Sequence, residues 1–327
     1  MKKLVSFNLK TKKVTSIILG FLIGILLAEI GLRVYTYGSD SFSFMRMKSQ
    51  TNLGTSGLVK ESGHPNILHE LKPNLDAYFK TKPFSTNSMG QRGKEYSRTK
   101  PENTIRIAVL GDSFTMGSGL TLEQTYPYKL EQLLNNTFEN QKFEVINFGV
   151  GGYSLLDYIS MINYKVRPCN PDLILVGFCA YNDWKFTKII DNPNFEPMKP
   201  RNGFWRFYLG KAILREWKNI RVPFQKPEEN FDFVDNHFSK LAKEIGDIPV
   251  NLIYLTMEEL DEKTAIRELA IKNGFHFIDP TSHFQNKKTR EFYLNFLDNH
   301  PNEKANEIYA ETIIDSIKPW INQLTNN

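Results

Sequence analysis

The sequence predicts an α/β fold in three layers, α/β/α, with a five-stranded parallel sheet, preceded by one N-terminal transmembrane helix. The layers are predicted by five short apolar runs, rich in β-branched residues, that alternate with amphipathic segments. Clusters of Gly, Ser and Asn follow three of these runs directly. Because ligands bind beyond the carboxyl ends of parallel strands, we expect the three clusters to meet at one edge of the sheet.

The five predicted strands are 105–110, 143–148, 173–178, 249–255 and 275–278. The helices expected between them are 122–135, 155–166 and one amphipathic helix before each of the last two strands, with a terminal helix after Pro301. Gly111 ends the first strand. Asp112, Ser113 and Thr115 follow it, and such residues favour helix caps and turns over helix interiors. We therefore expect the chain to turn into a short helix at Ser113.

The N-terminus has the order of a membrane signal, with five lysines before an uncharged run from Val14 to Ala28. That run spans about 22 Å, short of a hydrocarbon core of about 30 Å, so residues 30–34 must contribute while Glu29 and Arg33 snorkel. Lysines before a span remain in the cytoplasm, which places the rest of the chain on the extracytoplasmic side of the cell membrane. A cleaved signal peptide is the alternative. The long apolar run and the lack of an Ala-x-Ala site favour an uncleaved anchor.

These patterns divide the chain into residues 1–36, the basic tail and anchor; 37–103, a polar lead-in; and 104–327, the α/β domain. The lead-in is rich in Gly, Pro, Ser and Asn and is expected to be irregular, packed on the domain or linking to it. Basic and aromatic residues at about 185–235 indicate an insertion between the third and fourth strands. It is either a lid or surface-binding helix or, as favoured, a helix that packs its aromatic residues inward.

Composition excludes several classes of protein. The net charge of +5 comes in good part from the lysines before the anchor, so no nucleic acid partner is expected. Cys169 and Cys179 lie at opposite ends of the third strand, too far apart for a disulfide, and are expected to be free. No Cys and His cluster has zinc spacing and no glycine-rich phosphate loop is present, so we expect neither a metal nor a cofactor.

Four short motifs follow one another along the chain. They are Gly111-Asp112-Ser113-Phe114, residues 147–154, Tyr181-Asn182-Asp183, and Asp298-Asn299-His300-Pro301-Asn302. Together they resemble the four blocks of the SGNH, or GDSL-type, family of serine hydrolases, which supply a serine, a glycine, an asparagine and a histidine. The resemblance runs from about residue 104 to the C-terminus. It implies the flavodoxin-like SGNH hydrolase fold and a serine esterase that works without a metal.

Ester hydrolysis by this route needs a nucleophile, a base and an acid that orients the base. The resemblance assigns Ser113 as nucleophile and His300 as base, since of the six histidines only His300 has the family's flanking residues. Residues two apart in an extended loop point the same way, so Asp298 is expected to accept a hydrogen bond from His300. The acid more often precedes the histidine by three residues in this family. Asp279, after the last strand, is therefore the alternative.

The resemblance also implies an oxyanion hole made of the backbone N–H groups of Ser113 and Gly152 and the side-chain amide of Asn182. Gly149 and Gly151 are close enough to Gly152 to be alternatives to it. Asp112 and Asp183 are interpreted as residues that hold loops in place. The segment 84–93 resembles one that precedes the serine block in membrane-anchored members, and we expect it to act in packing and turns.

The function favoured by these residues is hydrolysis of acyl esters, chiefly acetyl esters on cell-surface carbohydrate. Around Ser113 the residues are small and polar, including Thr115, Gly117 and Ser118, which suits a small acyl group better than a long chain. An acyltransferase that modifies envelope polysaccharide, a lysophospholipase or a thioesterase are the alternatives. A binding module that has lost activity is disfavoured because all four motifs are present.

The membrane topology can be tested with tags at the two ends of the chain. A tag after Asn327 should be cut by protease added outside the cytoplasmic membrane, while a tag before Met1 should be protected, because the lysines keep that end inside. The opposite pattern of protection would overturn the predicted location.

Overall fold

The computed structural model describes residues 2–43, 46, 49, 53–179, 181, 183, 209, 210, 213 and 231–325. These residues fall into two compact units. The first contains the N-terminal helix α1, Lys2–Tyr37, with the 3-10 turn η1, Gly38–Phe42; the second contains residues 53–179 and 231–325. The insertion expected at about 185–235 lies outside the described residues, apart from 209, 210, 213 and 231–235.

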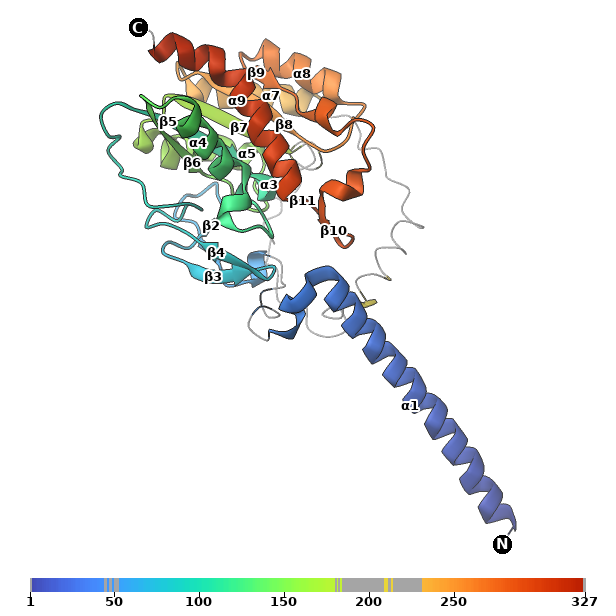
Figure 1. Ribbon diagram of the computed structural model, residues 1–327. Coiled ribbons are helices and arrows are strands. Elements are labelled where there is room, and N and C mark those ends of the chain that lie inside the picture. Colours follow the sequence, from blue (N-terminus) through green and yellow to red (C-terminus); the bar gives the residue numbers. More distant parts are fainter. Residues whose placement is uncertain are drawn as a thin grey trace. The chain divides into compact units, whose positions relative to one another are not determined.

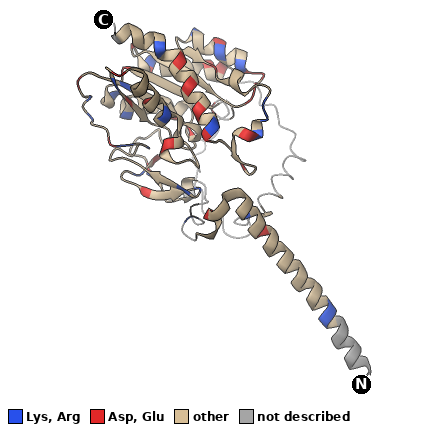
Figure 2. Cartoon of the chain, viewed as in Figure 1, with Lys and Arg blue, Asp and Glu red and all other residues tan. Residues whose placement is uncertain are grey.

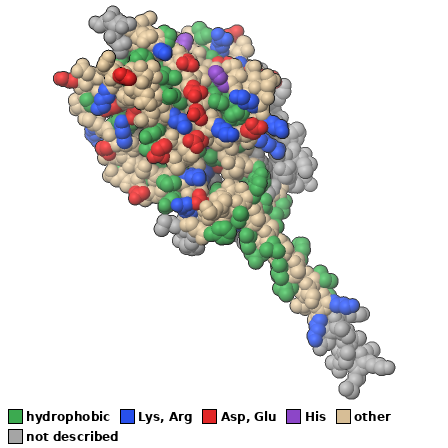
Figure 3. Space-filling model, in the orientation of Figure 1, with side chains coloured by type: hydrophobic (Ala, Val, Ile, Leu, Met, Phe, Trp, Pro, Cys, Tyr) green, Lys and Arg blue, Asp and Glu red, His purple; other side chains and the backbone are tan. Residues whose placement is uncertain are grey.

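Helix α1 exposes apolar side chains along much of its length, with Val14, Ile17 and Phe21 each more than half exposed (Figure 3). Thr11–Phe42 is long and apolar enough to cross a membrane by length and composition. Lysine residues, blue in Figure 2, lie toward its N-terminal end. Arg33 Nε donates to Glu29 Oε1 at 2.6 Å, so the two residues expected to snorkel form an ion pair. Residues four apart face each other on a helix, so the two charges pair within it.

The second unit is built on a parallel sheet of five strands in the order β6-β5-β7-β8-β9. The strands are β5, Thr104–Gly111; β6, Lys142–Asn147; β7, Leu173–Cys179; β8, Val250–Leu255; and β9, His276–Ile278. This is the flavodoxin-like order, in which the first strand lies between the second and third. Each predicted strand is found to within one residue at either end, so the predicted fold is confirmed.

Helices cover both faces of the sheet, as Figure 1 shows. Helices α4, Tyr126–Thr137, and α9, Glu303–Thr325, cover one face; α5, Leu155–Met161, α7, Phe231–Ile245, and α8, Lys263–Lys272, cover the other. The remaining helical turns are α3, Ser113–Met116, η3, Leu122–Gln124, the π-helical η4, Ile162–Val166, and η5, η7 and η8 at Arg167–Cys169, Thr281–Phe284 and Thr289–Phe292. The predicted α/β/α layering is therefore present.

The side chains of β5 alternate between the two faces of the sheet, and both sets are tightly packed. Ile107 and Val109 pack with α4 and α9, while Ala108 and Leu110 pack in the core on the other face, and all four are fully buried. A strand that is apolar on both faces appears in the sequence as a continuous apolar run, and β5 could be predicted for this reason. The carboxyl end of β5 is consequently held firmly in space.

The lead-in is more ordered than its composition indicates. It forms the turn η2, Leu53–Thr55, and two antiparallel strand pairs: β1, Val59–Glu61, with β2, His69–Leu71, and β3, Asp76–Phe79, with β4, Lys82–Ser85. Strands of three or four residues are too short to show a clear period-2 pattern. Contacts with the α/β domain hold the segment in place. For example, Tyr96 donates hydrogen bonds to Glu131 on α4 and to the carbonyl of Val145 on β6, both at 3.0 Å.

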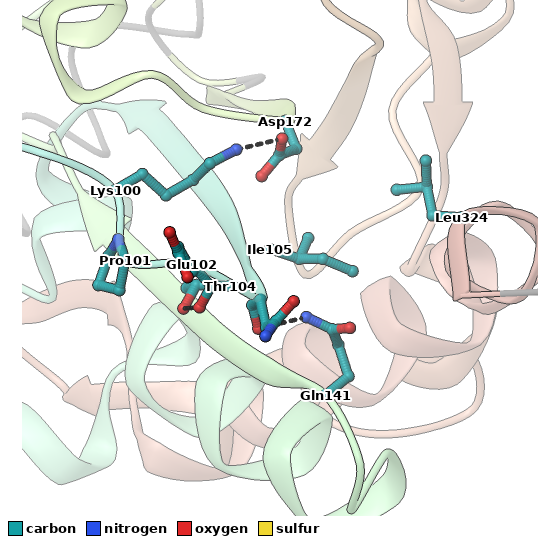
Figure 4. A pocket seen from close by; sticks show the side chains of 9 residues that line it. Lys100, Pro101, Glu102, Thr104, Ile105, Gln141, Asp172 and Leu324 are labelled. Carbon is teal, nitrogen blue, oxygen red and sulfur yellow. Dashed lines mark hydrogen bonds and ion pairs between the residues drawn. The ribbon is translucent and has the colours of Figure 1, made fainter. Parts of the chain in front are cut away.

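The amino edge of the sheet is closed by paired polar groups. Arg106 is fully buried and donates to Glu144 Oε2 at 2.6 Å and to the carbonyl of Cys169 at 2.6 Å. A shallow pocket lies at this edge, where Lys100 and Asp172 form an ion pair (Figure 4). It is at the opposite end of the strands from the residues predicted to be catalytic. The two cysteines are free and buried, as predicted, and burial raises the pKa of both thiols.

Candidate active site

Strand β5 carries Ser113 to the carboxyl edge of the sheet. The strand ends at Gly111, and Asp112 then caps α3 by accepting a hydrogen bond from the N–H of Phe114 at 2.8 Å. A Cβ atom at Gly111 would lie 1.9 Å from Oγ1 of Thr115, so only glycine allows so tight a turn. Ser113 is partly exposed at the start of α3. It lies beside the point where the strand order changes direction, the usual place for a ligand in this fold.

A hairpin from the C-terminal part of the chain supplies the other two predicted catalytic residues. Strand β10, Tyr293–Asn295, pairs with β11, Asp298–Pro301, and Asp298 and His300 lie two apart on β11. Nε2 of His300 lies 3.0 Å from Oγ of Ser113, and its Nδ1 donates to Oδ1 of Asp298. This arrangement leaves Nε2 free to accept the proton of the serine hydroxyl, as a general base requires.

A third charged group meets Asp298. Nζ of Lys80, in the lead-in, donates to Oδ2 of Asp298 at 2.6 Å. Burial by itself would raise the pKa of Asp298, but His300 and Lys80 lower it by more, so the net shift of this pKa is downward. Both neighbours thus favour the ionised form of Asp298, and each of its oxygens accepts a hydrogen bond.

The second motif lies against α3 and presents one unused backbone donor. The N–H of Gly149 donates to Oδ1 of Asn147 at 2.8 Å, and that of Gly151 to Sδ of Met116 at 3.3 Å. No described residue accepts a hydrogen bond from the N–H of Gly152, which has a φ of +90° that favours glycine. Of the three glycines, Gly152 is thus the candidate for binding an oxyanion. The third predicted donor, Asn182, lies outside the described residues.

His69 holds the peptide group that contains this donor. Its Nε2 lies 3.0 Å from the carbonyl oxygen of Gly151, and because a carbonyl only accepts, Nε2 carries the proton. The carbonyl of Gly151 and the N–H of Gly152 point in opposite directions from one trans peptide. A hydrogen bond to the carbonyl therefore restricts the direction of the N–H. The hydroxyl of Tyr153 donates to the backbone carbonyl of His69 at 2.7 Å and holds this histidine in turn.

Arg92 supports the loop behind the nucleophile. Its guanidinium is almost fully buried and donates to the carbonyls of Met116, the last residue of α3, and of Gly117 and Leu120 after it. Burial lowers the pKa of Arg92 to about 9. The guanidinium also lies 4.6 Å from the ring centre of Phe84. This is the packing role expected for the segment 84–93.

The other acidic candidates are engaged elsewhere. Asp279 accepts hydrogen bonds from the N–H and hydroxyl of Thr281 and forms an ion pair with Lys263 at 3.0 Å. Asp183 is fully buried and accepts from the N–H of Cys179 at 2.8 Å and the hydroxyl of Tyr158 at 3.0 Å. Burial raises the pKa of Asp183, with a further contribution from Asp112. Within the described residues, no three His, Cys, Asp or Glu side chains group closely enough to hold a metal ion.

Lys80, His69 and Arg92 are the site residues that could not be assigned from the sequence. His69 is one of the five histidines without motif flanks, and Lys80 lies in a stretch with no recognisable pattern. Of the three, only Arg92 lies in a segment with an expected role, the packing segment 84–93. All three belong to the lead-in and reach residues that are distant in the sequence.

Comparison with known proteins finds one matching family model and several similar solved structures. The model of the GDSL-like Lipase/Acylhydrolase family matches residues 109–308. No curated protein matches the chain. Among solved structures it is similar to a two-domain esterase active on acetylated mannans, at 16% identity over 66% of this chain and 50% of that one, with a TM-score of 0.45. This chain thus corresponds to about half the length of that esterase.

Two further structures show a similar level of likeness. A variant of the acetyl-xylooligosaccharide esterase Axe2 from Geobacillus stearothermophilus is 16% identical over 65% of this chain and 94% of its own, with a TM-score of 0.44. The psychrotrophic esterase EstA from Pseudoalteromonas sp. is 16% identical over 68% of this chain and 100% of its own, also with a TM-score of 0.44.

Substitutions at the three hydrogen-bonded residues test their assignment. Ser113→Ala and His300→Ala should each lower kcat for ester hydrolysis by up to about 10⁶-fold, and Asp298→Asn should cost less. Ser113→Ala should also abolish labelling by a fluorophosphonate probe. Asp279→Asn is the matched control and should keep nearly full activity, because Asp279 is bonded to Thr281 and Lys263. A greater loss for Asp279→Asn than for Asp298→Asn would show that the acid is wrongly assigned.

The oxyanion hole is tested by Asn182→Ala. An amide that binds charge present only in the transition state should lower kcat by about 10²–10³-fold and leave KM nearly unchanged. A change confined to KM, or loss of folding seen by circular dichroism, would instead indicate a structural role for Asn182.

Proposed function

The chain belongs to the GDSL-like lipase/acylhydrolase family and is a hydrolase of ester bonds, and from this we propose that it removes acetyl groups from cell-surface carbohydrate by a Ser-His-Asp mechanism. The observation that carries the mechanism is the line of contacts from Ser113 through His300 to Asp298 at the carboxyl edge of the sheet. It supplies a nucleophile, a base and a fixed anion in the order that acyl transfer requires.

In the first half of the proposed reaction, Oγ of Ser113 attacks the ester carbonyl while Nε2 of His300 takes the hydroxyl proton. The resulting oxyanion is bound by the N–H groups of Ser113 and Gly152 and by the amide of Asn182. Collapse of this intermediate breaks the bond to the alcohol, which leaves with the proton held by His300. The acyl group then remains on Ser113.

In the second half, His300 takes a proton from water and the hydroxide attacks the acyl-enzyme. The bond to Oγ of Ser113 breaks, His300 returns the proton to Oγ, and the carboxylic acid is released. Asp298 keeps its charge throughout and stabilises the imidazolium that forms in each half. Its lowered pKa supports this role, because it stays ionised while His300 gains and loses a proton.

A small acyl group is favoured by the crowding beside Ser113. A Cβ atom at Gly151 would lie 3.0 Å from Cδ2 of Leu53, 3.4 Å from Cε of Met116 and 3.6 Å from Cβ of Ser113. These side chains limit the space between Gly151 and Ser113. An acetyl group fits such a space more readily than a long acyl chain does.

The proposed carbohydrate substrate follows from location and surroundings. The rings of Phe114 and His300 lie 5.7 Å apart, and those of Phe114 and Tyr181 lie 6.0 Å apart; Phe114 is buried, while Tyr181 and His300 are partly exposed beside Ser113. Aromatic faces beside polar groups suit sugar rings. The lysines before the apolar run of α1 support an extracytoplasmic position for the catalytic domain, where envelope glycans lie.

A panel of esters tests the proposed substrate. The full chain in detergent should cleave acetyl esters with a higher kcat/KM than octanoyl or longer esters, and should release acetate from an acetylated polysaccharide. Ser113→Ala is the control for contaminating esterase. A kcat/KM that rises steadily with chain length beyond butyryl would indicate a lipid substrate instead.

The same panel separates hydrolysis from transfer. Added sugar acceptors should leave the yield of free acetate unchanged if water is the acceptor. Appearance of the acetyl group on the added sugar at the expense of acetate would identify an acyltransferase.

A further inference from the structure

We propose that Lys80 is a positioning residue of the catalytic site, which holds Asp298 in the orientation that His300 needs; this proposal rests on the function proposed above. Nζ of Lys80 donates to Oδ2 of Asp298 at 2.6 Å, and the two residues are 218 positions apart in the sequence. Lys80 belongs to the lead-in and not to any of the four motifs. The lead-in would thus be a working part of the active site.

The geometry of the carboxylate explains what Lys80 does. Asp298 has two oxygens, and Lys80 occupies Oδ2 while Nδ1 of His300 donates to Oδ1. With Oδ2 bound, rotation of the carboxylate about its last bond would break a charge-assisted hydrogen bond, which is among the stronger kinds. The imidazole is therefore kept with Nε2 toward Ser113, 3.0 Å from its hydroxyl oxygen.

The contact differs from an ordinary surface ion pair. Pairs that are fully solvated contribute little, because water screens them and both side chains lose freedom. Here the side chains of Lys80 and Asp298 are only 18% and 19% exposed. The stem of Lys80 also passes Gly119, where a Cβ atom would lie 3.5 Å from Cδ of the lysine. Packing of this kind restricts where the ammonium group can go.

The backbone at Lys80 is held in an uncommon conformation. Lys80 and Thr81 form the two-residue turn between β3 and β4, with φ values of +49° and +72°. Such turns favour Asn-Gly, and a positive φ is rare for a β-branched residue. Two hydrogen bonds to Ser49 hold the turn: its carbonyl accepts from the N–H of Lys80 at 2.8 Å, and its hydroxyl from that of Thr81 at 2.9 Å. Strain kept in this way is typical of functional sites.

The positive charge of Lys80 does not by itself favour the reaction. Nζ of Lys80 lies 3.3 Å from Nδ1 of His300, so its charge opposes the positive charge that the imidazole acquires during catalysis. A benefit to the reaction must therefore come from orientation. If the charge effect were the larger one, removing Lys80 would raise kcat.

The test compares four variants of the full chain in detergent. They are Lys80→Met, Lys80→Arg, Lys80→Gln and, as a matched control on the same hairpin, Lys82→Met. Lys80→Met and Lys80→Gln should lower kcat for an acetyl ester about 10- to 100-fold, the scale of loss for a misplaced catalytic group, with KM nearly unchanged. Lys80→Arg should recover most of the activity, and Lys82→Met should match the wild type.

A double substitution separates positioning from general stability. Because Lys80 acts through the carboxylate, Lys80→Met should cause no further loss of kcat in an Asp298→Asn background. Equal losses of kcat in both backgrounds would overturn the proposal. It would also be overturned if the folded Lys80→Met and Lys80→Gln variants had a kcat within twofold of the wild type or above it. Thermal unfolding of each variant shows which of them are folded.

The rate of labelling of Ser113 by a fluorophosphonate probe distinguishes the two proposals. If the wild type labels rapidly but cleaves no acetyl ester, the proposed substrate is wrong. The role of Lys80 is then tested by labelling rates, which should be about 10- to 100-fold lower for Lys80→Met and Lys80→Gln than for the wild type. If acetyl esters are cleaved equally by the wild type and Lys80→Met, only the role of Lys80 is wrong. A wild type that neither labels nor cleaves any ester would overturn both.

Discussion

The contact between Nε2 of His300 and Oγ of Ser113 joins residues 187 positions apart, and much of the structure serves to hold its two ends. Ser113 is held by a fully buried strand and by a cap on the first turn of α3. His300 is held by a short hairpin and by Asp298. A distance of 3.0 Å between side chains from such separate parts requires rigid supports on both sides, because proton transfer tolerates little displacement.

Close approach of backbones makes this arrangement possible. A Cβ atom at Gly149 would lie 2.5 Å from the backbone nitrogen of Met116, so the second motif can lie against α3 only without a side chain at that position. Asn147 bridges the same two segments, since its amide donates to the carbonyl of Thr115 at 2.9 Å and its oxygen accepts from the N–H of Gly149. The second motif and the turn that carries Ser113, the proposed nucleophile, are therefore parts of one packed cluster.

The lead-in completes the site from a third direction. His69 contacts the peptide before Gly152, Lys80 contacts Asp298, and Arg92 contacts the carbonyls after α3. The basic side chains thus bind three different parts of the candidate active site. The lead-in was expected either to pack on the α/β domain or to link to it, and these contacts show that it packs.

The sequence by itself determined the sheet and its order of elements, because buried parallel strands and amphipathic helices leave strong periodic signals. The resemblance of four short motifs to the SGNH family predicted Ser113 and His300, and a period-2 spacing added Asp298; the structure brings these three side chains together. Tertiary structure alone decided which other groups meet them. Lys80 lies in a turn whose Lys-Thr sequence does not signal positive φ, and its partner is 218 residues away. Such contacts depend on how distant segments pack, and no local pattern records that packing.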